Sequence, residues 1–147
     1  MGGRRAYKRL QHAPPETAAV HDMTIEGQGV AAVDGKRVFI PGAIAGETVT
    51  FRRLRTRRNY DEAELLQVES AAPDRVAPGC RYFGTCGGCS LQHLAPAAQL
   101  RMKEQVLLES LRRIGGVEPE RWLPAVTGSP WGYRRRARLG ARPVEAK

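Results

Sequence analysis

Three cysteines lie within ten residues of one another, and their spacing is the most specific chemical signal in the sequence. They are Cys80, Cys86 and Cys89, spaced C-x5-C-x2-C, and the chain contains no other cysteine. Two glycines between Cys86 and Cys89 let the backbone turn tightly, so several sulfur atoms can point toward one centre. Thiolates are soft ligands that suit zinc or an iron–sulfur cluster, so we expect a metal site here rather than inert buried thiols.

The fourth ligand decides which metal such a site would hold. His93 follows Cys89 closely, and three thiolates plus its imidazole ring form a geometrically possible zinc site. An iron–sulfur cluster usually takes a fourth cysteine, and this chain has none left. On these residues alone the spacing slightly favours zinc, and both metals stay open.

The charge of the chain points to nucleic acid. Its formal net charge is +9 over 147 residues, and many arginines gather in two runs that contain no acidic residue. Tyr60 follows the first run and could stack on an unpaired base, although a half-buried strand tyrosine is the more frequent case. The predicted RNA-binding residues are Arg52, Arg53, Arg55, Arg57, Arg58, Tyr60, Arg134, Arg135, Arg136 and Arg138.

Short strand-like segments between residues 17 and 70 predict a small β-barrel. Asp34-Gly35 favours a two-residue type I′ hairpin turn between two of them. Four or five short strands in about fifty residues are typical of an OB-type barrel, whose rim loops often grip nucleic acid. The expected strands are residues 17–24, 30–33, 37–40, 47–54 and 60–68.

The segments on either side of this barrel are less regular. Residues 1–16 are basic and predict a flexible tail, whereas residues 71–116 contain the cysteine loop and then a helix from Pro96 to Ile114. Five apolar residues share one face of that helix and predict packing against a core. They are Leu100, Leu107, Leu108, Leu111 and Ile114.

Residues 117–147 are expected to begin a further region that is incomplete in this chain. Trp122 and Trp131 are predicted packing anchors, and residues 133–142 are predicted to form an arginine-rich strand. A strand needs a partner, and no later segment supplies one. We therefore expect the chain to be cut off inside a second domain.

The sequence lacks an apolar segment that could span a bilayer or act as a secretory signal. An odd number of clustered cysteines fits a reducing cytosol and a metal better than it fits a disulfide framework. We expect a soluble, cytoplasmic protein that has no membrane partner.

Three motifs stand out when the chain is considered as a whole. The first comprises the segments Gly27-Gln-Gly29-Val-Ala, Val38-Phe-Ile-Pro-Gly-Ala43 and Gly46-Glu47-Thr-Val, which are similar to a TRAM domain, a small RNA-binding barrel. The second motif is the cysteine cluster followed by Gln92-His93, and the third is Trp131-Gly-Tyr-Arg-Arg-Arg-Ala-Arg-Leu-Gly140. Together they resemble the RNA uracil-5-methyltransferases, most closely the RlmD type that modifies 23S ribosomal RNA.

This resemblance implies a fold and a reaction. The fold would be an OB-like TRAM barrel over 17–70 and an iron–sulfur segment over 71–116, ahead of an α/β Rossmann-like methyltransferase domain. Cys80, Cys86 and Cys89 would be three ligands of a 4Fe-4S cluster whose fourth cysteine lies downstream. The reaction would transfer a methyl group from S-adenosylmethionine to carbon 5 of a uridine that has left its stack. The catalytic nucleophile and base would lie in the later domain, so none is assigned here, and the full-length enzyme would be a monomer.

Two other classes of protein fit parts of the pattern. A free-standing RNA-binding protein with a Cys3His zinc site is the main alternative, and metal content separates it from the methyltransferase. The radical methylthiotransferases also carry a TRAM domain, but their C-x3-C-x2-C motif precedes the barrel. Here the spacing is C-x5-C-x2-C and the barrel comes first, which argues against that class.

Overall fold

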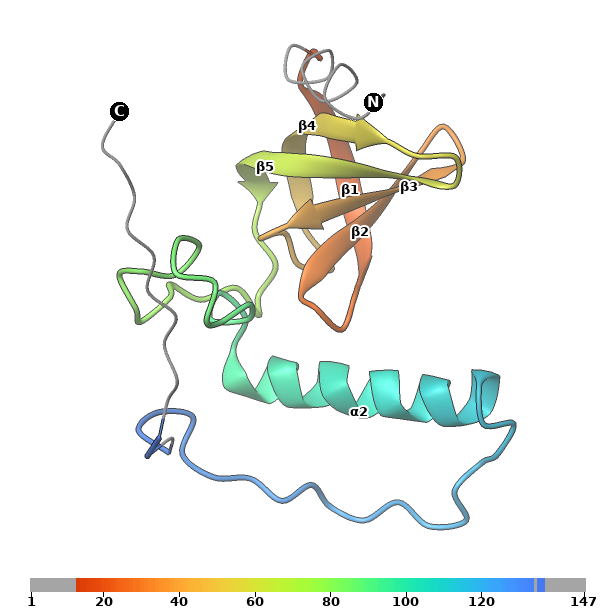
Figure 1. Ribbon diagram of the computed structural model, residues 1–147, viewed down its shortest axis with the longest axis vertical. Helices are drawn as coiled ribbons and strands as arrows, with labels where there is room; N and C mark the ends of the chain where they lie inside the picture. Colours follow the sequence, from red (N-terminus) through yellow and green to blue (C-terminus); the bar gives the residue numbers. More distant parts are fainter. Residues whose placement is uncertain (1–12, 134, 137–147) are drawn as a thin grey trace. The chain divides into compact units, whose positions relative to one another are not determined.

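Figure 1 shows a computed structural model of the chain, which describes residues 13–133, 135 and 136. The chain divides into two units, residues 1–117 and 118–147. Among the described residues, no helix combines the length and apolarity needed to cross a membrane. The elements of the first unit are β1 (Glu16–Met23), β2 (Gln28–Val33), β3 (Lys36–Pro41), β4 (Thr48–Thr56), β5 (Tyr60–Ser70) and α2 (Pro96–Arg113).

The five strands close into a barrel in the order β1-β2-β3-β5-β4 (Figure 1). Strands β3 and β5 run parallel, while the other neighbouring strands are antiparallel. Closure gives every strand two neighbours, so the sheet of the described residues has no edge strand. The predicted OB-type barrel is confirmed, and its strands lie within two residues of the predicted bounds.

The β2–β3 connection is the two-residue hairpin that the sequence predicts. Val33 pairs with Lys36, so only Asp34 and Gly35 form the turn. Both have positive φ angles, 51° and 74°, as a type I′ turn requires.

The barrel core follows the period-2 alternation of the strands. Val38 and Ile40 of β3 and Val49 and Phe51 of β4 are fully buried, while the residues between them point outward or are only half-buried. Gly29 of β2 has no room for a side chain, because a Cβ there would lie 2.8 Å from the Cβ of Ala43. This close approach is a structural reason for glycine in the Gly27-Gln-Gly29 motif.

A second apolar cluster fastens the segment after the barrel to the barrel itself. Its buried members are Ile44, Ala72, Leu94 and Ala98, of which Ala98 belongs to the first turn of α2. The cysteine loop lies between Ala72 and Leu94 in the chain, so both of its ends are anchored in this cluster.

The helix begins at the predicted proline and ends one residue before Ile114. Of the five residues predicted to pack against a core, Leu100, Leu108 and Leu111 are half-buried, but the prediction is wrong for the other two. Leu107 is 52% exposed and Ile114 is 87% exposed. The second cluster reaches α2 only through its first two turns, at Ala98 and Met102. The apolar stripe therefore continues beyond the residues that cover it in the described part of the chain.

In the second unit, residues 118–133, 135 and 136 contain no helix or strand. Trp122 and Trp131 are 41% and 57% exposed, so the prediction that they anchor packing is wrong for the described structure. Tyr133, Arg135 and Arg136 lie in no strand, and the rest of the predicted strand, residues 134 and 137–142, falls outside the described residues. The predicted tail also falls mostly outside them, and Glu16 already belongs to β1.

Candidate RNA interface and cysteine loop

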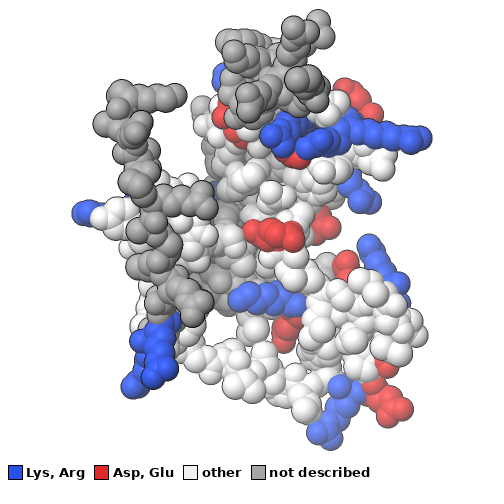
Figure 2. Space-filling view, in the orientation of Figure 1, with Lys and Arg blue, Asp and Glu red and all other residues white. Residues whose placement is uncertain are grey.

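Three arginines of the first run, Arg52, Arg53 and Arg55, lie on β4, and the register of the β4–β5 hairpin places carboxylates opposite two of them. Arg52 pairs with Glu64 and Arg55 pairs with Glu62 across the strands. The corresponding ion pairs measure 3.2 Å and 3.7 Å. These exposed pairs contribute little to stability, but they neutralise part of the predicted basic surface. Figure 2 accordingly shows basic and acidic side chains beside one another over the barrel.

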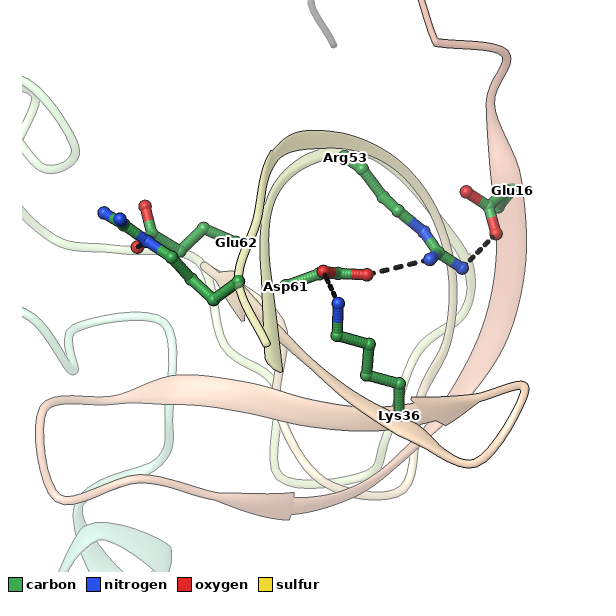
Figure 3. A network of polar contacts seen from close by, with 6 residues as sticks. Glu16, Lys36, Arg53, Asp61 and Glu62 are labelled. Atoms are coloured by element: carbon green, nitrogen blue, oxygen red, sulfur yellow. Dashed lines mark hydrogen bonds and ion pairs between the residues drawn. The ribbon is translucent and has the colours of Figure 1, made fainter. Parts of the chain in front are cut away.

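Arg53 points the other way and takes part in a buried network (Figure 3). Its guanidinium donates to Asp61 and to Glu16, each at 2.8 Å. Lys36 donates to the other oxygen of Asp61 at 2.6 Å. The carboxylate of Asp61 is fully buried, and the side chains of Lys36 and Arg53 are 24% and 20% exposed. Hydrogen bonds and the charges of Glu16 and Asp61 raise the pKa of Arg53 despite its burial.

The arginines most open to a ligand are at the turn of this hairpin. Arg57 has a side chain that is 51% exposed and lies 3.6 Å from Glu62. Arg58 is exposed, and within the described residues it has no ion pair. The turn that carries them is closed by a hydrogen bond from the N–H of Arg57 to the carbonyl of Tyr60.

Tyr60 lies at the start of β5 and is 36% exposed. Its ring forms an edge-to-face contact with Phe39 of β3, with ring centroids 5.3 Å apart. The sequence reasoning missed Phe39, because strand pairing between β3 and β5 was not predicted. Of the second arginine run, Arg135 and Arg136 are exposed, whereas Arg134 and Arg138 lie outside the described residues.

The cysteine loop is a series of tight turns that leaves two of its three cysteines exposed. The N–H groups of Phe83 and Cys86 donate to the carbonyls of Cys80 and Tyr82, each at 3.0 Å. The side chain of Gln92 accepts from the N–H of Cys80, which ties the start of the loop to its end. All three cysteines are free thiols, with Cys86 and Cys89 exposed and Cys80 half-buried.

These thiols fit a metal site in their chemistry but not in their arrangement. Three soft donors in one glycine-rich loop suit zinc or an iron–sulfur cluster. Among the described residues, however, no three His, Cys, Asp or Glu side chains lie together in a way that could hold a metal. The donor type follows from the sequence, and the ligand set stays a prediction.

His93 is buried beside this loop, against the ring of Phe83 at a centroid distance of 5.4 Å. Both of its ring nitrogens lack a hydrogen-bond partner within the described residues. Burial lowers the pKa of His93, and the positive charge of Arg75 lowers it further, while Glu47 acts in the opposite direction. The neutral imidazole is thus the favoured form near neutral pH.

Glu47 forms the polar joint between the barrel and the cysteine segment, and sequence reasoning missed it. Its buried carboxylate receives two hydrogen bonds from the guanidinium of Arg75 and accepts the N–H groups of Ile44 and Ala72 at 3.0 Å and 3.4 Å. Arg75 also donates to the carbonyl of Gly42 at 2.6 Å. Burial would raise the pKa of Glu47, but these hydrogen bonds and the charge of Arg75 lower it overall.

A short backbone connection continues from this joint to His93. Arg75 forms an isolated antiparallel bridge with Leu94, and the N–H of Val76 donates to the carbonyl of His93 at 3.0 Å. The joint and the buried imidazole are therefore parts of one packed region at the base of the cysteine loop. In the sequence, Glu47 stands out only as part of the Gly46-Glu47 motif. Its burial, which requires a charged partner such as Arg75, is visible only in the structure.

No protein-family model matches the chain. The 23S rRNA (uracil(1939)-C(5))-methyltransferase RlmD of Nitrosococcus oceani is 54% identical over 134 residues, which cover 90% of this chain and 30% of that protein. The protein of the same name from Alkalilimnicola ehrlichii is 47% identical over 147 residues, covering 100% and 32%. A solution structure of a conserved protein from Methanococcus maripaludis covers 46% of this chain and 99% of its own, at 26% identity and a TM-score of 0.36.

The chain spans about a third of the length of the curated relatives that it matches. The resemblance to RlmD-type RNA uracil-5-methyltransferases that three motifs indicate is confirmed, because the matches cover most of this chain.

Proposed function

We propose that this chain is the RNA-binding, N-terminal part of a 23S ribosomal RNA (uracil-C5)-methyltransferase, acting at the uracil 1939 that its relatives' names specify. The observation that carries the proposal is the high identity to these enzymes across the barrel, the cysteine loop and the helix. S-adenosylmethionine is the methyl donor that this family implies. We assign no catalytic residue to these 147 residues; their role is to bind and position RNA.

Within this proposal, the TRAM-like barrel binds the RNA backbone mainly through the turn between β4 and β5. Arg57 and Arg58 lie at this turn and are exposed, so they can approach phosphates without losing a buried contact. Arg52 and Arg55 add charge that is shared with Glu64 and Glu62. Arg53 holds the barrel together and is not assigned to RNA, which refines the prediction from the sequence.

The test is the salt dependence of binding to a fluorescein-labelled single-stranded RNA. Each phosphate contact on a single strand steepens the plot of log affinity against log salt by roughly 0.7. For the double variant Arg57→Gln/Arg58→Gln we expect a slope shallower by about 1.4 and an affinity about tenfold lower at low salt. The matched control is Arg112→Gln/Arg113→Gln, which removes the same charge from the end of α2.

An equal loss in the control would contradict the assignment to the hairpin turn, because it would show a general effect of net charge. Wild-type affinity that does not change with salt would contradict RNA-backbone binding by the barrel altogether.

We further propose that Cys80, Cys86 and Cys89 supply three thiolates to a 4Fe-4S cluster that has a structural role. Three free thiols, two of them exposed, in a loop with both ends anchored support this assignment. The fourth thiolate would come from a later part of the longer protein. The alternative is a zinc site completed by His93, and the observation that favours it is the buried imidazole beside the loop, which has no hydrogen-bond partner among the described residues.

Metal content separates these two assignments. We expect anaerobically purified protein of the relatives' full length to contain about four irons and four sulfides per chain, and Cys86→Ser to lose most of them. His93→Ala should keep its iron, because the imidazole is not a ligand in this assignment. A colourless protein that contains one zinc, lost in His93→Ala, would contradict the cluster and support the zinc site.

A further inference from the structure

The junction between the parallel strands β3 and β5 carries a pair of aromatic rings on the outer surface of the barrel. Val38 pairs with Asp61 in the register, and both are fully buried. Because side chains alternate along a strand, the residues on either side of this pair point outward. They are Arg37 and Phe39 of β3 and Tyr60 and Glu62 of β5.

Phe39 and Tyr60 touch edge to face across this junction, with ring planes 62° apart. Such a contact uses one face of a single ring, so the pair keeps further ring surface available. Tyr60 is 36% exposed and Phe39 is half-buried. Part of the Tyr60 ring is therefore open to a ligand at this surface.

The charges around the two rings suit a polyanion. Arg37 is exposed and lies opposite Tyr60 in the register, while Arg57 and Arg58 precede Tyr60 at the hairpin turn. The acidic member of the outward set, Glu62, lies 3.7 Å from Arg55 and 3.6 Å from Arg57, so its charge is offset. Figure 3 shows Glu62 on the outer side of β5, away from the buried network.

From this arrangement we propose that Phe39 and Tyr60 form a stacking platform for an unpaired nucleobase of the bound RNA, with Arg37 and Arg58 contacting the phosphates beside it. Aromatic rings that lie next to arginines on a barrel surface are the usual means of holding single-stranded nucleic acid without reading its sequence. The inference rests on the proposed RNA-binding function and adds the kind of RNA that the barrel takes, namely a single-stranded or looped segment.

A cycle that combines protein and RNA changes tests the platform in the full 147-residue chain. The probe is a single-stranded uridine-rich RNA of about ten nucleotides, intact or with one abasic position moved along it. We expect Tyr60→Leu and Phe39→Leu each to weaken binding of the intact RNA about tenfold with the salt slope unchanged. At the RNA position that stacks on the platform, loss of the base should weaken binding to the wild-type chain by a similar factor. The same abasic RNA should bind the Tyr60→Leu variant nearly as well as the intact RNA does.

Conservative variants separate stacking from folding. Tyr60→Trp and Phe39→Tyr keep a ring and should retain wild-type affinity for RNA. If the rings had only a structural role, the RNA affinity of the variants would instead fall in step with their thermal stability. The abasic scan of the wild-type chain needs no variant, so it decides the matter even if Phe39→Leu unfolds.

The outcomes also separate this inference from the function on which it rests. RNA binding that depends on Arg57 and Arg58, but that neither the ring substitutions nor any abasic position weakens, would overturn the platform alone. Equal affinity for a duplex of the same sequence would also overturn it, because paired bases cannot stack on the rings. Absence of any RNA binding by the wild-type chain would overturn both proposals.

Discussion

Replacing Asp61 by asparagine is expected to lower the free energy of unfolding by about 3 kcal/mol, because it removes one partner from a buried ion-pair network. The Asp61 carboxylate is fully buried and lies 2.6 Å from Lys36 and 2.8 Å from Arg53. Asparagine has nearly the same shape, so packing is kept while two partly buried cations lose their shared counter-charge. Glu16 still compensates Arg53, which places the expected cost near the lower end of the range for such networks.

Urea denaturation of the wild type and the variant measures this effect directly. The matched control is Glu64→Gln, which removes a carboxylate from an outward-facing position of the same strand. That carboxylate is 42% exposed and pairs only with Arg52 among the described residues, so a cost below about 1 kcal/mol is expected. Equal losses in the two variants would show that Asp61 has no special role in closing the barrel.

The Asp61 network illustrates what the sequence could and could not predict. The strands and the Asp34-Gly35 turn follow from local chemistry, and the structure has them within two residues of the predicted bounds. The arginines of β4 were predicted as a free basic surface because no acidic residue interrupts their run. Folding the hairpin about its turn places Glu64 and Glu62 opposite Arg52 and Arg55, and it brings Asp61 within 2.8 Å of Arg53. That pairing was therefore implicit in the sequence and needed only the register.

Other features depend on contacts between distant segments, which local patterns do not encode. Glu47 and Arg75 are separated by 28 positions, and nothing near either residue indicates that they meet. The helix period correctly groups Leu107 with Ile114, but a period identifies a face and not what covers it. Phe39 and Tyr60 meet only because β3 and β5 pair in parallel across the closing junction of the barrel.

The cysteine loop differs from these cases for a chemical reason. The spacing of the three cysteines predicts a thiolate metal site, because residues this close in the chain can direct their sulfur atoms to one centre. In metal sites the ligand positions are fixed by metal–sulfur bonds, and binding energy is part of folding energy. Ala72 and Leu94 pack in the second cluster and anchor the two ends of the loop, but this packing does not set the mutual distances of the thiols.

The joint at Glu47 provides the second large effect, which we expect to depend on pH. At pH 7, Glu47→Gln should destabilise the first unit by about 3 kcal/mol, because Arg75 loses the charge of its bidentate partner. The N–H groups of Ile44 and Ala72 bind different oxygens of the carboxylate, and the amide keeps one oxygen acceptor. Only one of these two N–H groups therefore loses its partner. Urea unfolding gives the difference, and Glu26→Gln in an exposed loop serves as the control, with almost no change expected.

The lowered pKa of Glu47 determines how this difference changes with acidity. The folded carboxyl has a pKa below its ordinary value of 4.5, so above that value the ionised group contributes its full stabilisation. As the pH falls through the folded pKa, protonation removes that contribution from the wild type, whereas the amide that replaces the carboxyl in the variant has no proton to gain. The gap between wild type and variant should therefore narrow as the pH falls below about 4.5. A gap that stays constant as the pH is lowered well below the folded pKa would show that Glu47 acts through its shape and hydrogen bonds, and that its charge on Arg75 does not stabilise the joint.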